Sequence, residues 1–401
     1  IFQLRFDLCQ RCFSFSQRGL KMNRLFESRF GSSECGFGLI EFGLSKFEVR
    51  CRPFISQSRV ISHLAHRYHG WPTLARRKNG QLLLVCSGGR ESHVCPFGRV
   101  ELMRSDDGGR SWSWPQTLID TAIDDRDAGV LETPTGSLLV TTFTSLAFEQ
   151  PRYFARADKQ QVARWSAARD RVPEATRKKM LGEWIIRSSD GGQSWSAPSR
   201  CGVNSPHGPI ALSDGCLLYA GKELYHGTNR IGAALSVDDG VSWKWSGTIP
   251  SRPGDDHRQY HELHAVEAAP GKLIAHIRNH NPRHAGETLQ SESADGGRTW
   301  STPHEIGVWG LPSHLLKLAD GRLLMSYGHR RKPFGNQVRI SDDAGATWSE
   351  PIGLSEDGIG GDLGYPSTVQ LDNGHLVTAW YEKMKGSSLA VLRQARWRLR
   401  G

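Results

Sequence analysis

Short apolar runs alternate with polar positions along this chain, and they come in pairs joined by a tight turn. Six segments share one layout, in which a strand-like run leads into a glycine turn and a leucine-rich run returns; the last reads STVQLDNGHLVTAWYE. This alternation predicts β-hairpins, and no stretch approaches the ~18 consecutive apolar residues of a membrane-spanning helix. The turn glycines are Gly80, Gly136, Gly215, Gly271, Gly321 and Gly374.

A second pattern, Ser-x-Asp-x-Gly-x-Ser/Thr-Trp, follows each of the first five hairpins. Its aspartate can accept backbone N–H groups across a turn, its glycine permits a positive φ, and its tryptophan can pack beneath the turn. The pattern resembles the Asp-box of sialidase-like β-propellers, which in that family is structural and lies away from the active site. The aspartates are Asp107, Asp190, Asp238, Asp295 and Asp343.

The two repeats together predict one architecture. Six units of four strands indicate an all-β fold, a six-bladed β-propeller with Asp-box turns, over residues 56–401. The sixth unit supplies only three strands, so we expect a strand around residues 59–66 to complete it and close the ring. Residues 146–183 interrupt the second blade with an insertion of helical composition, which we expect to lie over one face of the domain.

Charge and cysteines change this picture little. The net charge of +10 would favour an acidic partner, but much of the excess lies near the N-terminus and in residues 152–180, and no nucleic-acid-binding motif accompanies it. Cys9 and Cys12 form a CxxC pair with no second pair at zinc-ribbon spacing. We predict that residues 1–55 are a poorly ordered extension, without the residue progression of a signal peptide.

The order of the strands gathers a particular set of residues at one mouth of the ring. The glycine turn and the Asp-box turn of each unit fall on one rim, so the residues that enter the first strand and leave the second must meet at the opposite mouth. These positions carry Arg, His, Asp, Glu and Tyr, as in DDRDAG at 124–129, DDHRQYHE at 255–262 and DLGYPS at 362–367. A purely structural ring would not need this asymmetry, so we predict a polar functional pocket there.

The resemblance to sialidases extends to these positions, over about residues 65–401. It implies that Tyr365 in GYPST is a nucleophile, that Glu262 in YHEL activates it, and that Arg278 belongs to an arginine triad that binds a substrate carboxylate. A phenol suits this role because an anionic carboxylate nucleophile would be repelled by the substrate carboxylate. Further arginine candidates from the same comparison are Arg90, Arg330 and Arg331.

The chain departs from the family at the first blade. Gly70 stands where sialidases have their first triad arginine, and Arg67 or Arg126 are the candidates to replace it. The family's acid/base aspartate is expected in the loop after the first hairpin, which here holds only Glu91 and His93. The altered first blade suggests a substrate that differs from ordinary sialosides.

The proton donor therefore stays open among Asp127, Asp125 and Glu91, with Asp127 as the first candidate. Many histidines also occupy the predicted mouth, and each is expected to be a hydrogen-bonding pocket residue rather than a metal ligand. The remaining candidate substrate contacts are His93, Arg126, His207 and Glu382.

The resemblance thus implies a sialidase-like exo-glycosidase that releases terminal sialic acid or a related acidic sugar with retention of configuration. The alternatives are a propeller hydrolase or lyase for another polysaccharide, and a carbohydrate-binding propeller without turnover. We expect an acidic sugar or glycan as the partner, no cofactor or metal, no nucleic acid, no membrane span, and a monomer. The family alone favours a secreted or periplasmic location.

Overall fold

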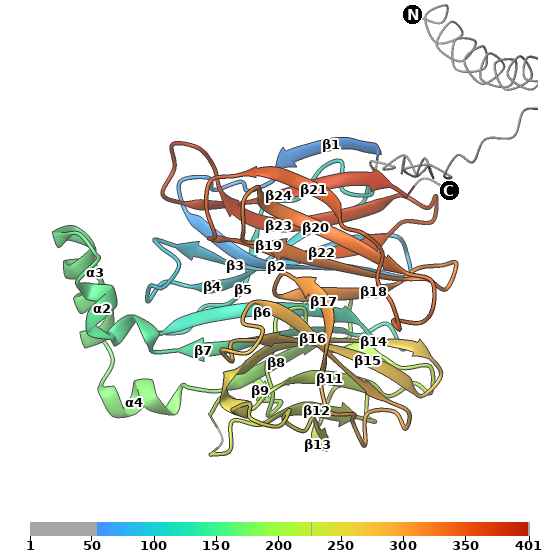
Figure 1. Ribbon diagram of the computed structural model, residues 1–401. Helices are drawn as coiled ribbons and strands as arrows, with labels where there is room; N and C mark the ends of the chain where they lie inside the picture. Colours follow the sequence, from blue (N-terminus) through green and yellow to red (C-terminus); the bar gives the residue numbers. More distant parts are fainter. Residues whose placement is uncertain (1–53, 226, 400–401) are drawn as a thin grey trace, which may run out of the picture. The chain divides into compact units, whose positions relative to one another are not determined.

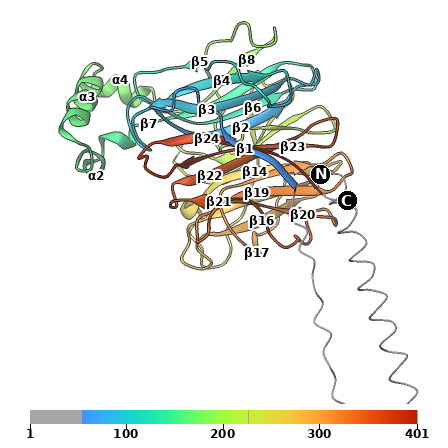
Figure 2. The ribbon, with the colours of Figure 1, turned by 90° about the horizontal axis from the view of Figure 1, so that it is seen from above.

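The computed structural model describes residues 54–225 and 227–399. The described chain forms six antiparallel sheets of four strands, arranged as the blades of a propeller (Figures 1 and 2). The predicted extension lies outside the described residues apart from positions 54 and 55, and so does the Cys9–Cys12 pair. The all-β propeller prediction is confirmed.

In each of the first five blades the strands follow chain order from the centre of the ring outward. Blade 1 holds β2 (Tyr68–Arg76), β3 (Leu82–Arg90), β4 (Arg99–Ser105) and β5 (Gln116–Ile119). Blade 2 holds β6 (Asp124–Glu132), β7 (Leu138–Ser145), β8 (Glu183–Ser188) and β9 (Ser199–Arg200). Blade 3 holds β10 (Ile210–Ala211), β11 (Leu217–Lys222), β12 (Ile231–Ser236) and β13 (Lys244–Thr248).

Blade 4 holds β14 (Tyr260–Ala269), β15 (Lys272–Asn279), β16 (Glu287–Ser293) and β17 (His304–Trp309). Blade 5 holds β18 (Ser313–Lys317), β19 (Leu323–His329), β20 (Phe334–Ser341) and β21 (Ile352–Gly358). Blade 6 is built from both ends of the described chain, in the order β22 (Leu363–Gln370), β23 (Leu376–Lys383), β24 (Ala390–Arg398) and β1 (Phe54–Val60).

The ring closes where β1 pairs antiparallel with β24, from Phe54 opposite Arg398 to Val60 opposite Arg393. Closure by a strand that precedes the first hairpin was predicted, but the strand begins earlier in the chain than the expected 59–66. Residues after Val60 leave the sheet and lead to the inner strand of blade 1. This closure removes the open edges that a curved sheet would otherwise present.

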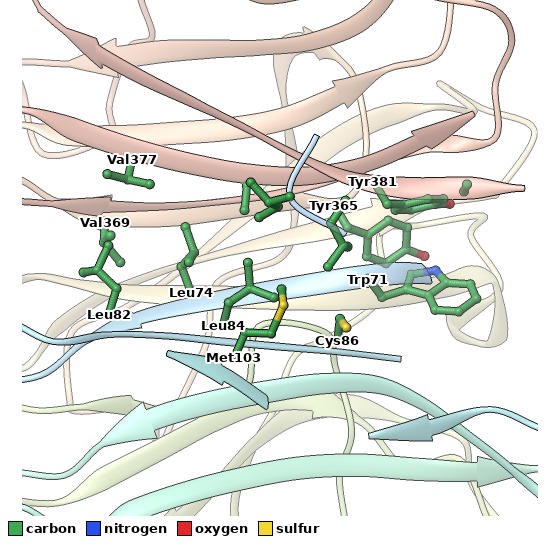
Figure 3. Packing of buried hydrophobic residues seen from close by; sticks show 14 of the residues in the cluster. Trp71, Leu74, Leu82, Leu84, Cys86, Met103, Tyr365, Val369, Val377 and Tyr381 are labelled. Carbon is green, nitrogen blue, oxygen red and sulfur yellow. The ribbon is translucent and has the colours of Figure 1, made fainter. Parts of the chain in front are cut away.

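The core is divided among the contacts between neighbouring blades. Six buried clusters of the described chain each draw side chains from two adjacent blades, because the two faces of a blade are apolar and pack against the next blade. Figure 3 shows the cluster between blades 1 and 6, which joins Leu74, Leu82 and Leu84 to Val369 and Val377. At one end this cluster becomes aromatic, with Trp71, Tyr365 and Tyr381 together.

The Asp-box turns have the hydrogen bonds that the sequence predicts. In the first copy, Oδ1 of Asp107 accepts the backbone N–H groups of Arg110 and Ser111, both at 2.8 Å, and Oδ2 accepts the Ser111 hydroxyl at 2.6 Å. These bonds, chiefly from Ser111, outweigh the effect of partial burial and lower the pKa of Asp107 to about 2. The other four aspartates accept the equivalent bonds from their own turns.

The insertion in blade 2 is helical, as predicted. It runs between β7 and β8 and contains η1 (Ala147–Glu149), α2 (Pro151–Phe154), α3 (Lys159–Asp170) and α4 (Glu174–Lys179). In Figures 1 and 2 these helices lie beyond the ends of the strands, at the rim where β7 ends and β8 begins, opposite the glycine turns. No helix in the described chain has the length and apolar character required to cross a membrane.

Candidate active site

The inner strands of four blades bulge at equivalent positions. Trp71, Asp127, Glu262 and Tyr365 each stand nine residues before the turn glycine of their own blade, and all four have a positive φ, from 29° to 55°. The strand register shifts at each of these places. A left-handed backbone is costly for such residues, and a bulge redirects a side chain out of the regular alternation.

Two of these residues meet across the ring, as predicted. The hydroxyl of Tyr365, from β22, donates to Oε1 of Glu262, from β14, at 2.5 Å. Nη1 of Arg278, at the end of β15, donates to Oε2 of Glu262 at 2.5 Å and to the Tyr365 hydroxyl at 3.1 Å. One carboxylate, one phenol and one guanidinium therefore form a closed group, and within the described chain the second terminal nitrogen of the guanidinium makes no further hydrogen bond.

The charges of this group are settled by its contacts. Burial would raise the pKa of Glu262, but the charge of Arg278 and the hydrogen bonds from Tyr365 and Arg278 lower it to about 2. Burial, followed by the negative charge of Glu262, holds the pKa of Tyr365 well above its usual value. At neutral pH the resting group is therefore an ionised carboxylate that accepts from a neutral phenol.

Asp127, at the bulge of β6, is a carboxylate whose ionisation is opposed by its surroundings; burial also raises the pKa of Asp125, to about 8. Burial raises the pKa of Asp127 to about 7, against the lowering effect of Arg126 and with a smaller raising effect from the charge of Glu262. Its side chain is buried, and Oδ1 has no hydrogen-bond partner among the described residues. A carboxyl group in this state can hold a proton at neutral pH and release it to an adjacent group.

The predicted arginines divide into two kinds. Arg330 lies 5.7 Å from the centre of the Tyr365 ring, and its charge helps to lower the pKa of Glu262, so it faces the central group. Arg331 instead stacks on the Trp309 ring at 3.7 Å. Of the two alternatives, Arg330 is therefore the one that the fold brings to Tyr365.

Trp71 fills the first blade's part of the mouth, next to Gly70. Its indole is buried against the Tyr365 ring at 6.3 Å, in an edge-to-face arrangement. Arg126 lies over the indole face at 4.5 Å, with two long hydrogen bonds of 3.3 Å to His93 O and Asp124 Oδ2. Of the two proposed replacements for the missing arginine, Arg126 neighbours Asp127, whereas Arg67 faces Glu91.

Several other predicted residues are held by neighbours of their own. Arg90 is fully buried in a bidentate pair with Asp124, at 2.5 and 2.8 Å. Oε1 of Glu382 accepts from Trp380 and Arg393, inside blade 6.

Two of the candidate proton donors are engaged in the same way. Asp125 accepts from the backbone and hydroxyl of Thr121. Glu91 accepts from Arg164 and Trp165 of α3 and so anchors the insertion. Asp127 is therefore the candidate donor that the fold places beside Glu262.

His93 belongs to a network that the sequence did not single out. Asp362 accepts from Tyr68 at 2.8 Å, pairs with Nδ1 of His93 at 2.9 Å, and forms an ion pair with Lys383 at 2.9 Å. The His93 ring also packs edge-to-face on Trp71 at 5.0 Å. Asp362 stands three residues before Tyr365, and that short spacing was the available signal.

His207 contacts Thr73, His264 and His314, which belong to the inner strands of three other blades, rather than the Tyr365 group. The three histidines line one end of a cavity of about 630 Å³ that reaches the turn rim at Asp372 and Gly374. His264 accepts the Leu315 N–H at Nδ1, so its neutral ring carries the proton on Nε2 and has no lone pair for a metal. No described trio of His, Cys, Asp or Glu side chains has a metal-site arrangement.

Known proteins place this architecture in a family. The BNR repeat-like domain family matches residues 171–378, which is half of the chain. The chain belongs to this family of sialidase-superfamily propellers. A sialidase from Bacteroides fragilis is 26% identical to this BNR propeller over 331 residues, which is 75% of the chain and 57% of that relative. The chain thus spans little more than half of the relative's length.

Solved structures agree on the fold. A crystal structure of a Dyadobacter fermentans protein of unknown function has a TM-score of 0.69 with the BNR propeller, at 24% identity, and covers 86% of this chain and 99% of that one. A Hadza microbial sialidase has a TM-score of 0.63 at 20% identity, over 86% of this chain and 68% of its own. At these identities the likeness concerns the fold alone.

Proposed function

We propose that this BNR propeller is a retaining exo-glycosidase of the sialidase type, which releases terminal sialic acid or a related acidic sugar from glycoconjugates. The observation that carries the proposal is the 2.5 Å hydrogen bond from the Tyr365 hydroxyl to Glu262, made across the ring between two strained inner-strand positions. A buried phenol paired with an ionised carboxylate is a nucleophile joined to its base.

The first chemical step joins the sugar to the enzyme. The Tyr365 oxygen attacks the anomeric carbon, its proton passes to Glu262, and the bond to the leaving oxygen breaks as Asp127 protonates that oxygen. Because the pKa of Tyr365 is well above and that of Glu262 far below the usual value, a free phenolate is strongly disfavoured in the resting site. Proton transfer must therefore accompany formation of the bond from Tyr365 to carbon.

The second step returns the enzyme to its starting state. Asp127, now ionised, takes a proton from a water molecule as that water attacks the anomeric carbon. The Tyr365 oxygen leaves and recovers its proton from Glu262. Two displacements at one carbon give net retention.

An acidic sugar suits the positive charge around the phenol. The second terminal nitrogen of Arg278 has no hydrogen-bond partner among residues 54–225 and 227–399, and Arg330 lies over the Tyr365 ring. Two guanidinium groups therefore approach the point where a carboxylate on the anomeric carbon would lie. Arg126 lies on the face of Trp71 with long hydrogen bonds, and it is our candidate for the third arginine that binds the carboxylate. Arg331, His93, Arg90, His207 and Glu382 then act by supporting the mouth or the ring.

The alternative is an enzyme for another acidic polysaccharide. Its support is Gly70, with Trp71 beside it, at the first-arginine position of sialidases. A clamp with a displaced third arginine would fit a carboxylate at a different angle or on a different ring carbon. The remaining possibility is a propeller that binds carbohydrate without turnover. A panel of glycosides separates a sialidase, an enzyme for another polysaccharide and a binding propeller.

The test is a panel of fluorogenic glycosides, with sialosides and uronides included, assayed with the wild type and two variants. We expect sialoside turnover, with kcat lower by about 10²- to 10⁴-fold in Tyr365→Phe and Glu262→Gln. Tyr381→Phe is the matched control, because Tyr381 packs beside Tyr365 and its hydroxyl makes one long bond to Asp362. A 3-fluorosialosyl fluoride, which slows release of the intermediate, should attach to the peptide that contains Tyr365.

Each result has one meaning for the proposal. Sialoside turnover that survives Tyr365→Phe unchanged would refute the tyrosine mechanism. Turnover of uronides alone would support the alternative enzyme. No turnover, together with saturable binding of a glycan, would identify a binding module.

A further inference from the structure

Arg278 has a third partner besides Glu262 and Tyr365. Its Nε donates to Nε2 of His280 at 2.8 Å, two residues further along the chain. Nε and Nη1 of the guanidinium are thus bonded on two sides, to the imidazole and to the carboxylate–phenol pair. A planar group held at both places cannot rotate without losing one set of bonds, so His280 fixes where Nη2 points.

The direction of this hydrogen bond determines the form of the imidazole. An arginine Nε is always a donor, so Nε2 of His280 must offer a lone pair, and the neutral ring carries its proton on Nδ1. The centre of the His261 ring, on β14 of the same blade, lies 4.7 Å from the centre of the His280 ring. The charged groups that act on His280 are Arg278, Glu262, Arg330 and Lys222.

We propose that His280 is a positioning residue, which in its neutral form aims the Arg278 guanidinium at the substrate carboxylate and on protonation releases it. The proposal rests on the function proposed above and adds a source of pH control in the carboxylate clamp. A protonated imidazole has no lone pair for Arg278 Nε, and it also repels the guanidinium. Protonation therefore removes one of the two attachments of Arg278.

The position of His280 favours the neutral form. The His280 side chain is exposed at the mouth, and its partial burial, the charge of Arg278 and the more distant Arg330 and Lys222 lower its pKa below 6.5, with Glu262 opposing them. Two of its neighbours have shifted pKa values of their own: burial lowers the pKa of His261 to about 4 and that of Lys222 to about 8. A change in carboxylate binding below about pH 6.5 that disappears in His280→Gln would therefore have His280 as its source.

Two substitutions separate the hydrogen bond from the titration. His280→Gln keeps an acceptor oxygen but cannot be protonated, and His280→Ala removes the acceptor. For the wild type we expect the sialoside KM to rise as the pH falls through the pKa of His280, with little change in kcat. His280→Gln should lose this rise, and His280→Ala should show a KM higher by about tenfold at every pH.

The controls and a measurement without substrate complete the test. His261→Gln should keep the rise in KM, and so should His304→Gln, whose exposed ring lies in the outer strand of blade 4. In a ¹⁵N-histidine-labelled sample, the signal absent from His280→Gln should be that of a ring with unprotonated Nε2 and a pKa below 6.5. A protonated Nε2, or a rise in KM that persists in His280→Gln, would overturn the proposal even in an active sialidase. An inactive enzyme would overturn the proposed function, and the NMR result would still decide how His280 meets Arg278.

Discussion

Both rims of the ring contain residues with a positive φ, but these residues have different roles at the two rims. At the turn rim, the first hairpin turns with Gly80 at φ 88°, and a Cβ added there would meet nothing within 4 Å. At the mouth, Tyr365 and Glu262 adopt left-handed φ values of 52° and 29°; Tyr365 is buried and Glu262 is half-buried. Glycine adopts this conformation without steric cost, whereas a side chain in it costs about 1–3 kcal/mol.

The contrast teaches where the molecule tolerates strain. Only a side chain can supply a phenol or a carboxyl group, so glycine cannot serve at the mouth. The strain persists there because the packing between blades determines the strand positions on both sides of each bulge. The charges differ in the same way, since the Asp-box turn lowers the pKa of Asp107 whereas the mouth raises that of Asp127.

Among the variants that test the comparison of the two rims, Asp127→Asn has the largest expected effect, because it should lower activity and raise stability together. We expect kcat on a natural sialoside to fall by about 10²-fold, and less on a substrate whose leaving group needs no proton. Wild-type kcat should decline as the pH rises through about 7, because the donor then loses its proton. Kinetics on the two substrates from pH 5 to 9 would check this.

The stability of the same variant follows from the sign of the shift. The pKa of Asp127 is raised in the folded protein, so the wild type loses stability as the pH rises from about 4, the unfolded value, to about 7. An asparagine side chain at this position cannot ionise, so the variant should become the more stable protein above pH 7 in thermal unfolding. Equal melting temperatures at pH 5 and pH 8, with an unchanged pH profile, would contradict the role given to Asp127.

The six-bladed ring could be predicted from the sequence because each repeat carries a local physical signal. A turn glycine and an Asp-box report the ends of strands, and counting them gives six blades. The closing strand was placed too late, because β1 pairs with β24 across the whole domain and has no local turn to mark it. The direction in which the helical insertion projects depends on Glu91 contacting Arg164 and Trp165, which composition alone does not show.

The site was predictable where strand order decides which residues meet, as for Tyr365 and Glu262. The site was not predictable where neighbouring side chains point in different directions. Arg330 and Arg331 are adjacent in sequence and point to Tyr365 and Trp309 respectively. The resemblance to sialidases, in which arginines bind a carboxylate, predicted that Arg90 contacts the substrate. In the structure it forms a buried ion pair with Asp124, which begins the inner strand of blade 2.

A smaller effect is expected at the turn rim, from Asp107→Ala. The variant loses the hydrogen bonds of one half-buried turn, so unfolding free energy should fall by about 1–2 kcal/mol with sialoside kcat unchanged. The pKa of Asp107 is lowered in the folded protein, so this contribution is present above about pH 4 and disappears as the pH falls towards about 2. Urea unfolding at pH 7 and pH 3 would measure it, with Asp106→Ala as the exposed control. A loss of activity in folded Asp107→Ala would break the separation of the two rims.

The smallest expected effect tests the backbone itself, through Gly80→Ala. The added methyl group meets no atom within 4 Å, so any loss of stability comes from the positive φ of 88° rather than from a clash. We expect a loss of about 1 kcal/mol, because a left-handed alanine costs ~1–2 kcal/mol and the stiffer unfolded chain returns part of that. Gly360→Ala is the matched control, since Gly360 also has open space but lacks a positive φ, and it should show no loss. If the two variants were equally stable, the left-handed backbone would carry little strain in this fold, and the bulges beneath Tyr365 and Glu262 would cost the protein far less than their φ values imply.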